Sequence, residues 1–437
     1  MINSEPLLKI NSQMNAEGIA NHRSWMERTF SQMTQGSLRS AIFMMLITSL
    51  GTGIFTLHHM FSNVGIVMSV VLIIVFGACY YLAADILIHA YTANPDAKTL
   101  NELVEKSLGK CASKTFDVIF FVFLVLVMIA GVQSISKNFY TNFQTQIWSF
   151  FSNIPETNRN YAYFNFYFAY VIGALLLMIN IKRSFDSLKN FSYISLTIFL
   201  YIIVVSLVQS PAYYQEQKKQ GRDTFNWVNF DLHGIMTNYG LVLFAFNCLM
   251  NFFGVVNTLA TPSVKRLRKI YFRTFACLSL LFIGFGFAIY FSLGDQISRD
   301  VDLFIFRPSI GSSDYFMQVG RCLLILSLWV NSGLMIYPLK MSIYSALKIE
   351  NTMFNNGWVS FLFTIIPVIF ASWFTNISTL ISVAGLTSIT ITVFTFPGLM
   401  AFKIGHVKKG WQKLLMSLWV AGLLAMGIAG AYFVVTN

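Results

Sequence analysis

The chain has 437 residues, of which 56% are hydrophobic and only 11% are charged, and its formal net charge is +12. A soluble domain of ordinary composition carries roughly 25% charged residues, so a water-exposed globular protein is excluded. Lipid can solvate such an apolar surface, but it accepts only helices or closed β-barrels, because every backbone polar group must be satisfied internally. The apolar runs are about 20 residues long, which predicts transmembrane helices rather than barrel strands.

Eleven apolar segments, named spans 1 to 11 in chain order, predict an all-α membrane protein. They form a 5+5 inverted repeat plus one helix if residues 37–210 and 236–402 are the two halves and 413–435 is the extra helix. Residues 1–36 form a polar N-terminal tail before the transmembrane domain of 37–437. The expected spans are 41–63, 65–90, 115–136, 161–181, 190–210, 236–260, 270–293, 318–339, 358–375, 378–402 and 413–435.

Lys and Arg are distributed unevenly between the two sets of connections. Of the 30, 22 fall on the side of the N-terminal tail. Loops on the inner side of a membrane carry the excess of Lys and Arg, so the N-terminus is predicted inside and the C-terminus outside. These loops account for the positive charge, and nucleic-acid binding is therefore not expected. The organelle stays open between the mitochondrial inner membrane, the vacuolar membrane and the plasma membrane.

Span 1 contains Gly51 and Gly53 at mid-depth, within the sequence Gly-Thr-Gly. Glycine tolerates non-helical backbone, so the pair favours an interruption of the helix. The second half-helix would then present free N–H groups and a positive dipole end, which attract a carboxylate. The alternative is that these small residues allow close helix packing.

Span 6 is the second irregular span. It contains Gly240, the polar Asn247 and Asn251 at mid-membrane, and Pro262 near its exit. Spans 1 and 6 are corresponding positions of the two halves. Paired irregular segments at corresponding positions indicate the binding site of a transporter.

Four stretches, in order along the chain, resemble the amino acid/auxin permease family, and the resemblance covers about residues 36–435. The Gly-Thr-Gly form of span 1 is closest to the proton-assisted branch of that family. The stretches are Gly51–His58 with Gly65 after it, Phe244-Ala245-Phe246, Tyr337-Pro338-Leu339, and Val383–Thr387 continuing to Phe396-Pro397-Gly398.

The resemblance implies a leucine-transporter-type fold and secondary transport of amino acids driven by protons or sodium, with no cofactor beyond the coupling ion. The substrate carboxylate would meet the backbone near Ser49, Gly51, Thr52 and Gly53. The opposite wall would be formed by Phe244, Ala245, Phe246 and Asn247. A sodium site would use oxygen atoms of Thr48, Ser327, Asn331 or Ser332.

Two departures from the family pattern support a second hypothesis. His58 replaces the family's Pro, and Leu249 and Met250 stand where the family places glycines, so they would fill the substrate window. The chain would then be a non-transporting accessory subunit of a large membrane complex, held through its N-terminal tail. The outer loops lack glycosylation sequons away from the membrane, which permits the mitochondrial respiratory chain as that complex.

Asp85 and His89 lie four residues apart near the inner end of span 2, on one helical face. A carboxylate inside a membrane span is costly and marks a functional site, so a proton relay for ion coupling is one interpretation. An interfacial salt bridge is the other. The sequence contains no motif of a soluble enzyme and no cysteine or histidine spacing typical of a metal site, so neither an enzyme nor a metal centre is expected.

Overall fold

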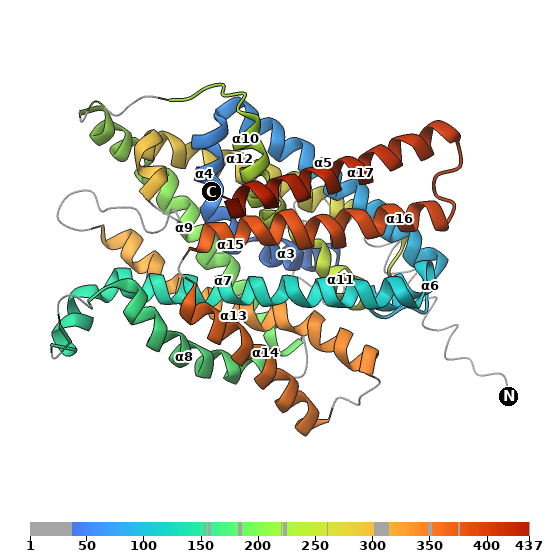
Figure 1. Ribbon diagram of the computed structural model, residues 1–437, viewed down its shortest axis with the longest axis horizontal. Helices are drawn as coiled ribbons and strands as arrows, with labels where there is room; N and C mark the ends of the chain where they lie inside the picture. Colours follow the sequence, from blue (N-terminus) through green and yellow to red (C-terminus); the bar gives the residue numbers. More distant parts are fainter. Residues whose placement is uncertain are drawn as a thin grey trace, which may run out of the picture.

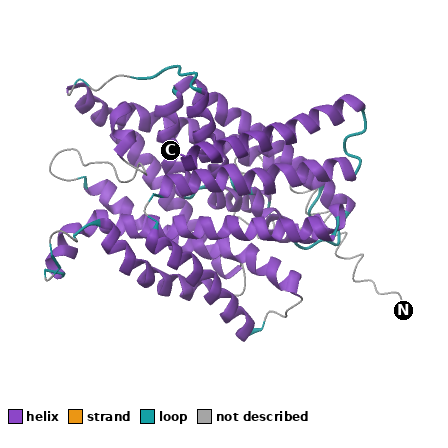
Figure 2. Cartoon of the chain, viewed as in Figure 1, coloured by secondary structure: helices purple, strands orange, loops and turns teal. Residues whose placement is uncertain are grey.

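The computed structural model describes residues 37–152, 154–155, 159–181, 186–219, 221, 225–259, 261–300, 314–347, 352–374 and 376–436. Within these ranges the chain is helical and contains no β-strand (Figure 2). Long helices, such as α7 (Lys110–Phe150) and α17 (Gly410–Thr436), run along the length of the molecule (Figure 1). The N-terminal tail, where contacts to other subunits were expected, lies outside the described residues.

The first expected half forms spans 1 to 5. Span 1 is divided into three elements, and a short amphipathic helix, α6, precedes span 3. The other elements of this half, besides α7, are α3 (Leu38–Ser49), η1 (Thr52–Thr56), α4 (Leu57–Val64), α5 (Ile66–Ala93), α6 (Leu100–Leu108), α8 (Tyr161–Asn180) and α9 (Asp186–Lys219).

The second expected half forms spans 6 to 10, and α17 follows as the extra helix. Spans 6 and 10 are each divided into three elements, and the middle element of span 10 is a π-helix, which the sequence did not predict. The elements are α10 (Leu232–Ala245), η3 (Leu249–Asn251), α11 (Phe252–Thr258), α12 (Val264–Asp300), α13 (Tyr315–Leu347), α14 (Met353–Trp373), α15 (Ile377–Ala384), η5 (Gly385–Thr395) and α16 (Phe396–Lys403).

The prediction of an all-α membrane protein is confirmed. Among the described residues, nine helices are long and apolar enough to cross a membrane, and the bent pair in span 1 brings the number to ten. The expected span 8 corresponds to α13, whose described apolar stretch, Tyr315–Asn331, is shorter. The prediction of eleven spans therefore holds only when α13 is included.

Three helices of the first expected half pack against their counterparts in the second, whereas α9 of span 5 packs on α12 and α13. Span 2 packs on span 7 (α5 on α12), span 3 on span 8 (α7 on α13), and span 4 on span 9 (α8 on α14). The second half of span 1, α4, packs on α10 of span 6. This is the pattern of contacts that two inverted five-helix repeats are expected to make, and it places spans 1 and 6 together at the centre.

Gly240 of α10 and Gly385 at the start of η5 let these two helices cross at backbone distance. A Cβ on Gly240 would lie 2.6 Å from the carbonyl oxygen of Ser382, and one on Gly385 would collide with the carbonyl oxygen of Gly240. Small residues allow membrane helices to approach in this way. Gly240, which the sequence linked to irregularity in span 6, therefore serves close packing.

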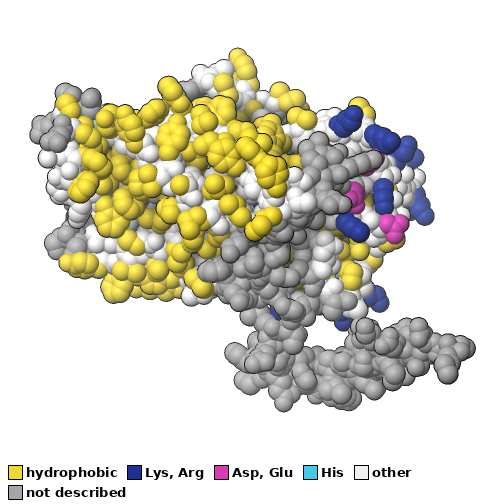
Figure 3. Space-filling view, turned by 90° about the horizontal axis from the view of Figure 1, so that it is seen from below, with side chains coloured by type: hydrophobic (Ala, Val, Ile, Leu, Met, Phe, Trp, Pro, Cys, Tyr) yellow, Lys and Arg dark blue, Asp and Glu magenta, His cyan; other side chains and the backbone are white. Residues whose placement is uncertain are grey.

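The outside of the molecule is apolar along most of its length. Hydrophobic side chains cover most of the face drawn in Figure 3, and Lys and Arg gather at one end of it. Exposed leucines of α17, such as Leu414 and Leu418, contribute to the apolar exterior. A bilayer can solvate this apolar zone, and the basic end then lies in water or among lipid headgroups.

Candidate functional site

Span 1 is interrupted between Ser49 and Thr52, as Gly51 and Gly53 predicted. The helix α3 ends where the N–H of Leu50 donates to the carbonyl oxygen of Leu46 at 2.8 Å. Gly51 then has extended backbone, with φ −131° and ψ −151°, and η1 begins at Thr52. The two halves of the span are bent by 49°. The first N–H groups of a helix have no acceptor within it, so η1 presents free donors at mid-span.

Span 6 is interrupted as well. The helix α10 ends at Ala245, a turn follows at Phe246–Cys248, and the chain becomes helical again in η3 and α11. Leu249 and Met250, which stand where the family places glycines, therefore do not make span 6 a continuous helix. The backbone at Phe246 (φ −81°, ψ 4°) and Cys248 (φ −96°, ψ −14°) stays at negative φ. Any residue can adopt such angles, so this turn does not require glycine.

The two interruptions contact each other directly. The hydroxyl of Ser49 donates to the carbonyl oxygen of Ala245 at 2.5 Å, across 196 residues of sequence. A Cβ on Gly53 would lie 2.9 Å from Cδ1 of Phe244 and 3.0 Å from Cα of Ala245. Gly53 is therefore required for the close approach of η1 to the end of α10.

A small cavity lies beside the two interruptions. The centre of a water molecule can reach about 50 Å³ of it, which is enough space for a few waters. Its lining is apolar along α7 and polar along the interrupted helices and α13. The lining residues are Thr48, Ser49, Gly51, Val127, Met128, Gly131, Val132, Ile135, Leu176, Phe244, Asn247, Leu328 and Asn331.

Two amide side chains of this cavity are buried and incompletely hydrogen-bonded. Asn247 is 3% exposed and Asn331 is 7% exposed, and the Oδ1 atom of each has no hydrogen-bond partner among the described residues. Gly51 lies against Asn331, because a Cβ on Gly51 would be 3.5 Å from Nδ2 of Asn331. A buried polar atom without a partner is costly, so these amides favour a polar ligand in the cavity.

The predicted substrate residues separate into four groups, of which Phe246 alone forms the last. The first group lines the cavity and consists of Ser49, Gly51, Phe244 and Asn247. The cavity is also lined by Thr48 and Asn331, which the sequence assigned to an ion site. The second group, Gly53 and Ala245, lies where the two interrupted helices contact each other. Thr52 begins η1, and its side chain lies outside the described residues.

The remaining residues of span 6 lie elsewhere. Phe246 packs among aromatic side chains, with its ring centroid 4.9 Å from that of Phe282 and 5.6 Å from that of Tyr80. The structure therefore places Phe246 in the aromatic core rather than in the cavity lining. Leu249 and Met250 line a separate small void that Phe116 also lines.

The expected sodium ligands are only partly brought together. The hydroxyl of Thr48 donates to the carbonyl oxygen of Met45 at 2.9 Å. The hydroxyls of Ser327 on α13 and Ser195 on α9 hydrogen-bond to each other. The side chain of Ser332 lies outside the described residues. The hydroxyls of Thr48 and Ser327 thus each have a hydrogen-bond partner within the protein, and these contacts do not indicate a sodium site.

Asp85 and His89, the second expected ion-coupling pair, contact Arg268 of α12. The Arg268 guanidinium donates to both carboxylate oxygens of Asp85, at 2.5 Å from Nε and 3.2 Å from Nη2. Nη2 also lies 3.3 Å from Nε2 of His89. Asp85 therefore forms a salt bridge, with a partner on α12 that the sequence did not reveal.

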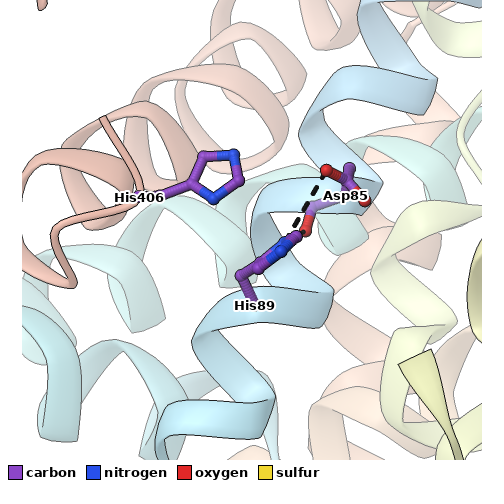
Figure 4. Close-up of side chains that lie close together, drawn as sticks. All are labelled: Asp85, His89 and His406. Carbon is purple, nitrogen blue, oxygen red and sulfur yellow. Dashed lines mark hydrogen bonds and ion pairs between the residues drawn. The ribbon is translucent and has the colours of Figure 1, made fainter. Parts of the chain in front are cut away.

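His406, in the connection between α16 and α17, completes this cluster (Figure 4). Its ring centroid lies 4.3 Å from that of His89. Burial lowers the pKa of His406, and so does the positive charge of His89 and of Arg268. Asp85, His89 and His406 could together offer ligand atoms to a metal ion. Arg268 already supplies the cation at this carboxylate, so the arrangement favours an ionic contact between α5 and α12.

Sequence reasoning missed the wall of the cavity on α7. Met128, Gly131 and Ile135 line it at helical spacing. The only sequence signal was a glycine in an apolar run, and many glycines of membrane helices serve packing instead.

Two interrupted helices that meet at a cavity inside paired five-helix halves define the class of membrane transporters with a leucine-transporter-type fold. Comparison of the whole chain supports this class. The model of the family described as transmembrane amino acid transporter protein matches residues 34–436. The chain belongs to this family, and the expectation that it is not an enzyme is thereby confirmed.

Similar proteins agree with this family. AAT1 of Plasmodium falciparum, a candidate amino acid transporter, is 26% identical over 62% of this chain and 42% of its own length. Vacuolar amino acid transporter 6 of Saccharomyces cerevisiae is 22% identical over 71% of this chain and 67% of its own length. The chain thus matches less than half of the Plasmodium protein and about two thirds of the yeast protein.

Among solved structures, the manganese transporter of Eremococcus coleocola is similar in fold. The TM-score is 0.52, and the match covers 91% of this chain and 86% of that one. The sequences are 10% identical, so the likeness concerns the fold alone. It confirms the leucine-transporter-type architecture that the family resemblance implied.

Proposed function

We propose that this protein is a secondary active transporter of neutral amino acids, working by alternating access around spans 1 and 6. Uptake would be coupled to protons or to sodium. The observation that carries this proposal is the cavity between the two interruptions, where the Asn247 and Asn331 amides have oxygen atoms without partners in the described part of the chain.

The two interruptions offer complementary charge to a zwitterion. The start of η1 presents N–H groups and the positive end of a helix, which suit the α-carboxylate. The end of α10 presents carbonyl oxygens and the negative end of a helix, which suit the α-ammonium group. The free Oδ1 atoms of Asn247 and Asn331 could accept further hydrogen bonds from that ammonium group.

The cavity wall supports neutral side chains as the substrate class. Apart from the polar residues of the interrupted helices and α13, the lining is aliphatic or aromatic, with Val127, Ile135 and Leu328 among it. No charged residue is part of this lining as described. An unpaired charge would be costly to bury there, whereas an apolar side chain would be favoured.

Each of the two halves would supply one interrupted helix, the halves being residues 37–210 and 236–402. The helix 413–435 would not be part of the repeat. The N-terminus would lie inside and the C-terminus outside, as the 22 basic residues on one side predict. The vacuolar names of yeast relatives favour a vacuole-like compartment over the mitochondrial inner membrane.

The accessory-subunit hypothesis is less well supported. It expects a continuous span 6 and no cavity beside Gly51. Span 6 is interrupted after Ala245, and Gly51 lines a cavity. Both observations favour transport.

Uptake into proteoliposomes tests the proposal. The purified protein would be assayed with labelled neutral amino acids between pH 5 and pH 8, under a proton gradient and under a sodium gradient. Gly51→Leu fills the cavity and is expected to lower uptake by about tenfold or more. Gly284→Leu is the matched control, since Gly284 lies on α12 with open space around its Cβ position. Absence of uptake for every neutral amino acid under both gradients would overturn the proposal.

A further inference from the structure

A second hollow lies on the outside of the molecule, between α5 and the beginning of α17. Leu82 of α5 forms one side, and Trp411, Leu415 and Trp419 of α17 form the other. His406 and Val407, from the connection that precedes α17, close one end. The centre of a water molecule can reach about 410 Å³ of this groove, against about 50 Å³ in the central cavity.

The groove opens toward the lipid. Leu82 is 39% exposed, Leu415 is 56% exposed and Trp411 is 59% exposed. From Trp411 to Trp419 the helix rises about 12 Å, so the groove extends from the helix start well into the apolar zone. Trp at the start of a membrane helix typically marks the headgroup level. Lipid tails therefore have direct access to the groove.

The polar end of the groove is basic. Three exposed lysines lie there: Lys408 and Lys413 each directly follow a residue that lines the groove, and Lys409 comes next to Lys408. No Asp or Glu occurs in the sequence after Glu350, so this connection contains no acidic partner of its own. Asp85 on the neighbouring α5 is bound by Arg268. The connection between α16 and α17 lies at one end of the molecule (Figure 1), and its positive charge is thus available to an anion there.

We propose that this groove binds one anionic phospholipid. An acyl chain would lie between Leu82 and Leu415, and the headgroup phosphate would contact Lys408, Lys409 and Lys413. Basic pockets between membrane helices on the inner side bind acidic headgroups, and each Lys near the surface adds to the attraction. The combination of an apolar groove and a basic rim distinguishes an intact lipid from a soluble phosphate, which would use the rim alone.

Native mass spectrometry of the full-length protein tests the headgroup. Detergent micelles would be supplemented with phosphatidylglycerol or with phosphatidylcholine. We expect one phosphatidylglycerol per chain to be retained in preference to phosphatidylcholine. K408Q/K409Q/K413Q is expected to lower this occupancy by about tenfold or more. K106Q/K110Q/K114Q is the matched control, because it removes three exposed lysines of α6 and α7.

A second pair of variants tests the acyl chain. Leu82→Trp fills the groove and is expected to lower the occupancy, whereas Val75→Trp, two turns earlier on α5 and also exposed, is expected to leave it unchanged. Gel filtration shows whether each variant stays folded and monodisperse.

Three results would overturn the proposal: equal retention of phosphatidylcholine, equal losses in the matched control variants, or full competition by soluble glycerophosphoglycerol. None of them bears on amino-acid uptake, so this lipid site and the transport function can fail separately.

Discussion

The hydroxyl of Ser49 donates a hydrogen bond to the backbone carbonyl of Ala245, at 2.5 Å. Ser49 is the last residue of α3 and Ala245 is the last residue of α10. One bond therefore joins the points at which spans 1 and 6 stop being helical. Because α10 ends at Ala245, this carbonyl has no N–H of a following helical turn to accept from. The Ser49 hydroxyl supplies the missing donor.

Ser49→Ala is expected to destabilise the protein by about 1 kcal/mol, because it leaves the carbonyl of Ala245 with one partner fewer in a buried place. Substrate affinity should fall as well, since Ser49 lines the cavity. Thermal unfolding and the uptake KM would be measured for the purified protein. Thr92→Ala is the control, because the Thr92 hydroxyl bonds within its own helix at an exposed position. Equal changes in both variants would contradict a special role for the bond.

The two glycines of span 1 are predicted to respond differently to alanine. At Gly53 the added Cβ would meet backbone of Ala245 at 3.0 Å, so η1 and α10 must separate. Such overpacking costs about 1–3 kcal/mol. At Gly51 the nearest atom is 3.5 Å away, which is an ordinary contact. Gly53→Ala should therefore lower the melting temperature and uptake, and Gly51→Ala should retain both within error. A larger loss in Gly51→Ala would show that the described packing of the interruptions is wrong.

The spans and the first interruption could be predicted from the sequence, because both depend on local signals. Span 2 was expected at 65–90 and α5 occupies Ile66–Ala93. Gly51 and Gly53 indicate the first interruption, because glycine tolerates non-helical backbone. The interruption after Ala245 was indicated instead by Asn247 and Asn251 at mid-membrane and by its correspondence to span 1. Its exact position could not be predicted, since its backbone angles suit any residue.

The partners in the ionic cluster could not be predicted for a different reason. Arg268 reaches Asp85 across 183 residues of sequence, and His406 comes from a third segment. Only the packing of α12 on α5 and the course of the connection after α16 bring them together. Helical spacing could therefore identify Asp85 and His89 as neighbours without showing what neutralises the carboxylate.

Gly131 allows a test of substrate size. It lines the cavity from α7, and a Cβ there would have no heavy atom within 4 Å. Gly131→Val should therefore fold normally while narrowing the cavity. Uptake of large neutral amino acids such as leucine should fall by about tenfold relative to alanine. The ratio of kcat/KM for the two substrates measures this effect, and an unchanged ratio would place the substrate side chain elsewhere.

His406 predicts a pH dependence of stability. Its pKa is lowered from the ordinary 6.5 by burial and by the positive charge of His89 and Arg268, while Asp85 acts in the opposite direction. The unfolded chain then binds more protons than the folded one between the lowered pKa and 6.5. Stability from this group is therefore complete above 6.5 and is lost as the pH falls through that window.

His406→Gln removes this contribution. The melting temperature of the wild-type protein should fall more than that of the variant when the pH is lowered from 7.5 to 5.5. His233→Gln is the matched control, because His233 lies at the start of α10, where its ring contacts Phe433 of α17. Parallel pH profiles for the wild type and His406→Gln would show that protonation of His406 does not oppose folding.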